Sequence, residues 1–180
     1  GSFSDMEAEA IRVPPGCDGM HAYIGMGIRG EERGRNWGGF CFPVPWNISD
    51  YTRAHFFRAA FETNAFGVVA NLHVLQEKGI ALPQILHACG GQSLSALWSQ
   101  ILADTTGICV QTYQNPECTA AGAAAMAAVG TGAYTSLTEA VAVFSEKGRL
   151  YTPAADSPYP EIYSEWLQLH RHMIAFQSNT

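Results

Sequence analysis

The sequence predicts a domain of the α/β class, and the observations that predict it lie near the middle of the chain. Residues 84–88 and 108–113 are short apolar runs, which are typical of buried strands. Between them, residues 93–106 place apolar side chains at helical spacing, and Gly107 follows as a helix end. A strand–helix–strand unit closes with a right-handed crossover, so we expect the two strands to be parallel neighbours.

The N-terminal part of the chain is predicted to contain a lead-in and two strands. Residues 1–15 read as a lead-in, and residues 16–180 as the domain itself. Residues 21–26 and 39–44 are short apolar runs bounded by glycine or proline, as strands are. The polar stretch 29–36 between them predicts a long exposed connection.

A long amphipathic helix is predicted next. From about residue 50 to residue 78, apolar side chains recur every three or four positions, which marks one face of a helix. Ser49 or Asp50 is expected to cap its start. Gly79 lies where a helix C-cap glycine is commonly found.

The C-terminal part is predicted to be largely helical. Residues 119–129 are small residues typical of a helix, and a Gly-Thr-Gly stretch ends them. Residues 136–139 form a capping box, in which the serine hydroxyl and the glutamate carboxylate each accept a backbone N–H, and a short helix follows to about residue 144. After a proline-broken loop at 153–160, four apolar positions define a last helix: Ile162, Trp166, Leu169 and Met173.

The composition indicates one folded domain with few surface charges. Hydrophobic residues make up 47% of the 180 residues, which excludes a disordered tail and is enough to bury a core. Charged residues make up only 14%, against about 25% in an ordinary soluble domain. Part of the surface is therefore expected to face another domain or a second copy of the chain, as in a homodimer.

Charge, hydropathy and cysteine usage exclude several classes. The net charge is −6 and no basic run occurs, so nucleic acid is not an expected partner. The longest apolar run, near residues 120–129, is too short to span a bilayer, and no secretory signal pattern is visible.

The five cysteines form no CxxC pair, as expected of free thiols in a reducing cytoplasm, and Cys89 is expected to be buried at a strand end.

Gly90 and Gly91 form the turn between the first strand of the central unit and its helix. Two glycines let the backbone approach a ligand closely, and the helix start behind them offers free N–H groups with a partial positive charge. These features suit a nucleotide phosphate, or an adenosine lying flat on the peptide. A tight turn without a ligand uses the same residues, so the pair alone does not decide between the two.

Three motifs, in one order, resemble the FGGY family of carbohydrate kinases. Residues 90–104, GGQSLSALWSQILAD, are similar to that family's adenine-side motif: a glycine-rich turn, a tryptophan, then Gln and Ala-Asp. Upstream, residues 58–62 (RAAFE) resemble the Arg-Ala-x-x-Glu of a long helix. Downstream, Glu117 and residues 121–124 (AGAA) resemble the Glu and the Gly-Ala-Ala that open the next helix. The resemblance covers about residues 16–175.

The resemblance implies an actin-like, ribonuclease-H-like ATPase domain with a mixed sheet flanked by helices. In such kinases two domains close around a cleft, with sugar mostly on the first and ATP mostly on the second. The chain is therefore expected to be the ATP-binding half of an ATP:sugar phosphotransferase, binding ATP or ADP with Mg²⁺ and reaching a sugar or polyol through an absent N-terminal domain. The expected nucleotide-binding residues are Gly90, Gly91, Gln92 and Ser95.

The chain also departs from the family pattern. The Gly-x-x-Asp-type motif that carries the family's catalytic aspartate is not found, so no catalytic base is assigned and the chain alone is expected to phosphorylate nothing. Asp18 does not match that aspartate; it is similar to a later Asp-Gly turn of the family, which opens a strand. Gln92 replaces the family's third glycine and Leu94 a frequent lysine, and both changes are expected to alter the nucleotide site.

Four other residues of the motifs are expected to have structural roles. Arg58 and Glu62 lie four residues apart on a helix and form either a solvated surface pair or a buried pair. Asp104 is expected to hold a loop, and Gly122 to let its helix pack closely against a neighbour.

Two other hypotheses stay open. The first is a nucleotide- or partner-binding module without kinase activity, which Gln92 and Leu94 favour. The second is an apolar interaction domain that keeps only the packing of this fold, and it predicts self-association without nucleotide affinity.

Overall fold

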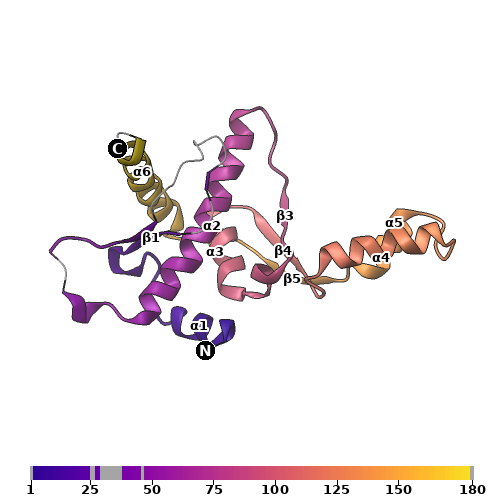
Figure 1. The fold of residues 1–180 in the computed structure, drawn as a ribbon, viewed down its shortest axis with the longest axis horizontal. Coiled ribbons are helices and arrows are strands. Elements are labelled where there is room, and N and C mark those ends of the chain that lie inside the picture. Colours follow the sequence, from indigo (N-terminus) through magenta and orange to yellow (C-terminus); the bar gives the residue numbers. More distant parts are fainter. Residues whose placement is uncertain (1, 25–26, 29–37, 46, 179–180) are drawn as a thin grey trace.

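The computed structural model describes residues 2–24, 27–28, 38–45 and 47–178. Its longest element is the helix α2 (Arg53–Glu77), which runs through the centre of the molecule between two small sheets (Figure 1). The predicted polar connection 29–36 lies outside the described residues. The long predicted helix is confirmed.

The larger sheet has three strands and mixed direction. β3 (Ile85–His87) pairs in parallel with β4 (Cys109–Tyr113), with Ile85 opposite Cys109, as the strand–helix–strand pattern predicted. β4 also pairs antiparallel with β5 (Lys147–Tyr151). The sequence analysis missed β5 because its sequence, KGRLY, is mostly polar and lacks an apolar run. The α/β class with a mixed sheet is confirmed.

The smaller sheet is a two-stranded antiparallel pair. β1 (His21–Tyr23) pairs with β2 (Gly39–Cys41), so both predicted strands are present but shorter than expected. Residues 25 and 26 of the first predicted strand lie outside the described residues. A 3-10 turn, Cys17–Gly19, leads directly into β1, which confirms the Asp18 turn predicted to open a strand.

The start of α2 differs from the prediction. Ile48–Asp50 form a separate 3-10 turn, and Thr52 is the N-cap, so neither Ser49 nor Asp50 caps the helix. The Thr52 N–H donates to the ring Nδ1 of His55 at 3.1 Å, which satisfies a backbone donor at the helix start. At the other end Gly79 takes a φ of +78°, as expected for a glycine after a helix.

The predicted helix 93–106 is divided into two parts. Gly91–Leu94 form a short 3-10 helix, and α3 (Ala96–Thr106) begins only after Ser95, which has an extended backbone (φ −82°, ψ 116°). Ser95 caps α3 with its hydroxyl, so the helix cannot continue back to residue 93. Gly107 closes α3 with a φ of +69°, as predicted.

A helical hairpin projects from the end of the larger sheet (Figure 1). It consists of α4 (Cys118–Gly130) and α5 (Leu137–Phe144), which pack on each other through the fully buried Ala125 and Ala140. The expected close packing at Gly122 is wrong, because no described heavy atom lies within 4 Å of the position of a Cβ there. The helices meet one turn further along, and Gly122 lines a cavity at the base of the hairpin.

The capping box before α5 is half confirmed. The Ser136 hydroxyl accepts the Glu139 N–H at 3.2 Å, as predicted. The Glu139 carboxylate instead accepts the N–H and the hydroxyl of Thr135, at 3.1 and 2.7 Å. The glutamate therefore reaches one residue further back than a capping box requires.

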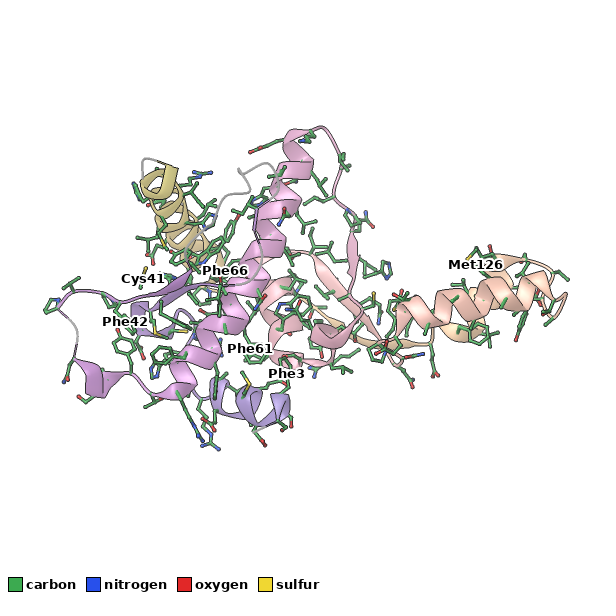
Figure 2. The ribbon with its side chains drawn as sticks, viewed as in Figure 1. Phe3, Cys41, Phe42, Phe61, Phe66 and Met126 are labelled. Carbon is green, nitrogen blue, oxygen red and sulfur yellow. The ribbon has the colours of Figure 1, made fainter. Side chains whose placement is uncertain are left out.

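The segment expected to be a lead-in contains the helix α1 (Phe3–Ala10). The ring of Phe3 packs edge-on against that of Phe61 on α2, with 5.3 Å between ring centroids (Figure 2). Ala10 is fully buried, and Glu9 accepts two hydrogen bonds from Arg53 at 2.6 and 2.7 Å. α1 is thus packed on the domain and contributes to its core.

The last helix, α6 (Tyr159–Ser178), closes the main core against α2. Its buried face is made of Tyr159, Tyr163 and Trp166, and the Trp166 indole N–H donates to the Ala22 carbonyl at 2.8 Å. The predicted last helix is confirmed, but Leu169, one of the four apolar positions that define it, is 39% exposed. Three rings fix the register of the helix against Phe66, and this register turns position 169 towards solvent.

Arg58 and Glu62 form the buried alternative of the predicted pair. Glu62 is 2% exposed, and its Oε1 accepts from Arg58 Nε at 2.9 Å, from the Gly16 N–H at 3.0 Å and from the Tyr159 hydroxyl at 3.0 Å. The Arg58 guanidinium also donates to the Tyr159 hydroxyl. This network ties α2, α6 and the turn before β1 together.

Candidate nucleotide-binding site

The double-glycine turn follows the carboxyl end of β3. Gly90 has a φ of +86°, a conformation that residues with a side chain rarely adopt. Its N–H donates to the Pro116 carbonyl at 2.9 Å, and its carbonyl accepts the N–H and the hydroxyl of Ser93 at 3.1 and 2.7 Å. These bonds hold the turn between the 3-10 helix and the segment before α4.

Gly91 and Gln92 are the accessible part of the turn. Both are exposed, and no described heavy atom lies within 4 Å of the position that a Cβ of Gly91 would occupy. A flat ligand can therefore contact the Gly91 backbone without displacing other residues. Gly90, Gly91 and Gln92 follow one another in this turn, and their contact with a nucleotide stays a prediction. Cys89, which precedes them, was expected to be buried, but β3 ends two residues before it and its side chain is exposed.

Ser95 lies apart from the exposed turn. It is fully buried, its hydroxyl donates to Glu7 Oε1 at 2.9 Å, and it accepts the Trp98 N–H at 3.0 Å. Both uses of the hydroxyl are internal to the chain. In this conformation Ser95 shapes the start of α3, and a direct contact with a ligand would require Glu7 to move.

Glu7 is a residue of this region that the sequence analysis missed. Besides the Ser95 hydroxyl, its Oε1 accepts the Leu97 N–H at 2.7 Å, so a carboxylate from α1 lies at the N-terminus of α3. That is the position where a helix attracts an anion. Glu7 is 88 residues from Ser95 in sequence, and no local pattern indicates the contact.

A cavity of about 180 Å³ adjoins the turn at Gln92. Phe57 and Phe61 of α2 and Phe3 of α1 contribute apolar walls, and Trp98 of α3 lines it as well. The Trp98 indole N–H is buried without a hydrogen-bond partner among the described residues.

The described residues contain no cluster of side chains that could bind a metal ion. Within them, no three His, Cys, Asp or Glu side chains are grouped so that they could hold an ion. Asp104, the acidic residue of the glycine-turn motif, accepts from Gln100 Nε2 and from the Ala154 N–H, both at 2.8 Å. Its predicted role in holding a loop is confirmed.

In the part of the chain that is described, none of the helices has the length and apolarity needed to cross a membrane.

Comparison with known families decides the identity of the fold. Residues 42–131, half of the chain, match the model of the C-terminal domain of the FGGY family of carbohydrate kinases. The chain belongs to this family. The matched range includes the double-glycine turn and the motifs on both sides of it.

Several curated relatives of this FGGY chain are sugar kinases from Escherichia coli. It is 32% identical over 125 residues to L-xylulose/3-keto-L-gulonate kinase of strain K12, covering 69% of this chain and 24% of the relative. It is 30% identical over 180 residues to autoinducer-2 kinase of strain O9:H4 (HS), covering 96% of this chain and 33% of the relative. The FGGY chain thus spans about a third or less of the length of these relatives.

Solved structures of family members confirm the fold of the FGGY chain. Xylulose kinase from Rhodospirillum rubrum matches with a TM-score of 0.75 and 29% identity, over 96% of this chain and 34% of that one. Glycerol kinase from Plasmodium falciparum, determined with ADP, has a TM-score of 0.76 at 17% identity, over 96% and 34% of the two chains, and shows the fold alone. The predicted actin-like ATPase fold is therefore confirmed.

Proposed function

We propose that this chain is the ATP-binding domain of an ATP-dependent carbohydrate kinase, and that a second domain outside the chain holds the sugar. The observation that carries the proposal is the exposed double-glycine turn at the end of β3, in a chain of the FGGY family. The names of the curated relatives, which are kinases, support the activity, and we propose a cytoplasmic location for the protein. Residues 1–15 then belong to this domain through α1, and residues 16–180 form its remainder.

We further propose that the turn binds the adenosine part of the nucleotide and leaves the phosphates elsewhere. The Glu7 carboxylate occupies the N-terminus of α3 and would repel a phosphate placed there. An adenosine has no such conflict, since its ring can lie on the Gly91 backbone. The cavity beside Gln92 has apolar walls suited to a base.

The chemistry of the reaction requires groups that the described residues do not supply. Bound ATP provides the phosphoryl group, and its Mg²⁺ neutralises charge on the phosphates. The described residues contribute binding and orientation of the nucleotide. The base that accepts the proton of the sugar hydroxyl is assigned to the second domain.

Calorimetric titration tests this proposal with three ligands: Mg-ADP, adenosine and pyrophosphate. We expect Mg-ADP and adenosine to bind and to compete with each other, and pyrophosphate to leave both unaffected. The variant Gly91→Asp should weaken binding at least about tenfold, because its side chain occupies the space over the turn. Its melting temperature should stay unchanged, since no neighbour lies within 4 Å of the new Cβ.

The matched control is Gly130→Asp at the far end of α4. Gly130 also has open space around its Cβ position, but it lies at the tip of the hairpin, away from the turn. The control variant should bind Mg-ADP like the unmodified chain. Competition by pyrophosphate, or equal affinity of the Gly91→Asp variant, would show that the turn does not hold adenosine.

A further inference from the structure

The helical hairpin that projects from the larger sheet is almost free of charge. Residues 118–145, which contain α4 and α5, include a single charged side chain, that of Glu139. Surfaces that face water are normally rich in charged residues of both signs. The composition of the hairpin is therefore that of a surface covered by another part of a protein.

The hairpin has very little core of its own. Of residues 118–145, all of which are described, only Ala125 and Ala140 are fully buried. The helix α4 has 13 residues and α5 has 8. Helices of this length are marginal in water by themselves, and most helices in proteins are stabilised by the packing of one face. An additional packing partner would therefore stabilise this hairpin.

One face of the hairpin is apolar and exposed. Gly122 of α4 and Val141 of α5 line the same cavity, of about 270 Å³, at the base of the hairpin. Met126 lies one helical turn beyond Gly122, and Leu137 one turn before Val141, so these four residues share a face. We call it the hairpin face. Met126, Leu137 and Val141 are 68%, 50% and 40% exposed, and Figure 2 labels Met126.

The one charge of the hairpin lies off this face. Glu139 is two residues from both Leu137 and Val141, and side chains two residues apart on a helix point in different directions. Its carboxylate accepts the N–H and the hydroxyl of Thr135, at 3.1 and 2.7 Å. The hairpin face therefore carries no charge, although the chain has a net charge of −6.

We propose that the hairpin face is the interface of a homodimer, in which the hairpins of two copies of this chain pack on each other as a four-helix bundle with two-fold symmetry. The occupant of the face is thus a second copy of the chain. This inference goes beyond the proposed function and does not depend on it.

The absence of charge favours a second copy as the occupant. A two-fold interface places the same surface against itself, so charges of one sign on it would meet and repel each other. A different partner is commonly recognised by complementary charges, and the hairpin face offers none. The hairpin also projects from the end of the larger sheet (Figure 1), so two hairpins can meet while the cores stay apart.

The size of the hairpin matches that of a stable interface. A standard interface takes about 20–30 residues and about 800 Å² of surface from each partner. Residues 118–145 fall within this number, and all of them except Ala125 and Ala140 are at least partly exposed. The hairpin can therefore form the interface without a contribution from the remainder of the chain.

The cavity at the base of the hairpin provides a specific fit. Its apolar walls include Val141 and Phe144 from α5 and Gly122 from α4. A two-fold axis between Met126 and the cavity places the Met126 of each copy over the cavity of the other. Methionine is unbranched and flexible and fills irregular gaps well, so its side chain suits such a cavity.

Analytical ultracentrifugation of the whole chain at about 1–100 µM tests the interface, since interfaces of this size have micromolar or tighter affinity. We expect a species of twice the 19.5 kDa of one chain at the upper end. Met126→Asp and Val141→Asp place like charges on both sides of the axis, so each should raise the Kd of the dimer at least about tenfold. Met126→Leu should leave the Kd nearly unchanged, because it keeps an apolar side chain of similar volume.

The matched control is Ile80→Asp. Ile80 is also a largely exposed apolar residue (52%), and it follows α2, whose end lies away from the hairpin (Figure 1). This variant should dimerise like the unmodified chain. Met126, Val141 and Ile80 are all exposed, so urea unfolding of the main core should be the same in the three aspartate variants.

Hydrogen exchange locates the contact. Amides of residues 118–145 should exchange more slowly at high than at low protein concentration, while those of α2 should not change. A chain that stays monomeric over the whole range would overturn the proposal and leave a domain outside the chain as the occupant of the hairpin face. A dimer that persists in Met126→Asp and Val141→Asp would also overturn it, because another surface then makes the contact.

The dimer and the proposed function fail in different ways. A chain that dimerises through the hairpin but does not bind Mg-ADP would refute the proposed function and support the interface. A monomeric chain that binds Mg-ADP would do the reverse.

Discussion

Replacing Glu62 by glutamine should destabilise the fold strongly, although the side chain keeps its size. Glu62 is 2% exposed and lies 2.9 Å from the Nε of Arg58, which is 6% exposed. The glutamine oxygen can still accept from the Gly16 N–H and the Tyr159 hydroxyl. What the variant removes is the negative charge that compensates the buried guanidinium.

The expected loss is about 3 kcal/mol, because breaking a buried ion pair by removing one partner typically costs about 3–5 kcal/mol. Glutamine belongs at the lower end of that range, since it preserves the hydrogen bonds to neutral donors. Against a total stability of about 5–15 kcal/mol for a domain, this is a large fraction. Adding Arg58→Met to the same chain should recover much of the loss, because the uncompensated charge is removed as well.

Urea unfolding followed by tryptophan fluorescence measures this effect. The midpoint should fall while the slope m stays the same, which marks a change in stability rather than in exposed surface. The matched control is Arg53→Ala, which breaks an ion pair with Glu9 that is exposed on the arginine side (77%). Exposed pairs contribute little, so this variant should unfold like the unmodified chain. A Glu62→Gln midpoint equal to that of Arg53→Ala would refute the reasoning.

Two further predictions concern the smaller sheet. Gly38→Ala should lower the free energy of unfolding by about 1–3 kcal/mol, because the new Cβ collides with the Tyr23 carbonyl. Gly39→Ala is the control, since its Cβ meets no neighbour within 4 Å. Urea unfolding of both variants measures the difference. Stability should also fall as the pH drops from about 7 to about 5, because burial holds the pKa of His21 below its ordinary value and the unfolded chain binds the proton first. The carboxylates of Glu62 and then of Glu165, which lies 3.9 Å away, raise the pKa of His21 but do not outweigh the effect of burial. His21→Gln should flatten the pH dependence of the melting temperature.

Local patterns predicted the elements that local interactions determine. The parallel pair β3 and β4 followed from two apolar runs and the helix between them, and Gly107 from the left-handed conformation that only glycine adopts readily. β5 escaped prediction because an exposed edge strand needs few apolar residues. The exposure of Leu169 could not be predicted, because the ring of Phe66, more than 90 residues away in sequence, helps to determine which face of α6 is buried.

In the candidate site, too, the residues of a local pattern could be predicted from the sequence, and the long-range contacts could not. Gly90, Gly91 and Gln92 could be predicted because a glycine pair between a strand and a helix is visible in the sequence itself. The hydrogen bond between the Gly90 N–H and the Pro116 carbonyl is different, because it depends on how β4 returns the chain to the end of β3. Long-range pairing of this kind leaves no periodic signal.

Glu7 shows how such a contact can change the chemical interpretation of a site. From sequence alone, a glycine turn before a helix suits a phosphate and an adenosine equally well. A carboxylate at the start of α3 separates the two, because it satisfies the Leu97 N–H and the Ser95 hydroxyl that a phosphate would need, and it places a like charge there. If phosphates bound at this helix, α1 would first have to leave, which would expose Ala10 and separate Phe3 from Phe61. The packing of α1 on the core therefore favours an adenosine site at the turn, with the phosphates directed away from α3.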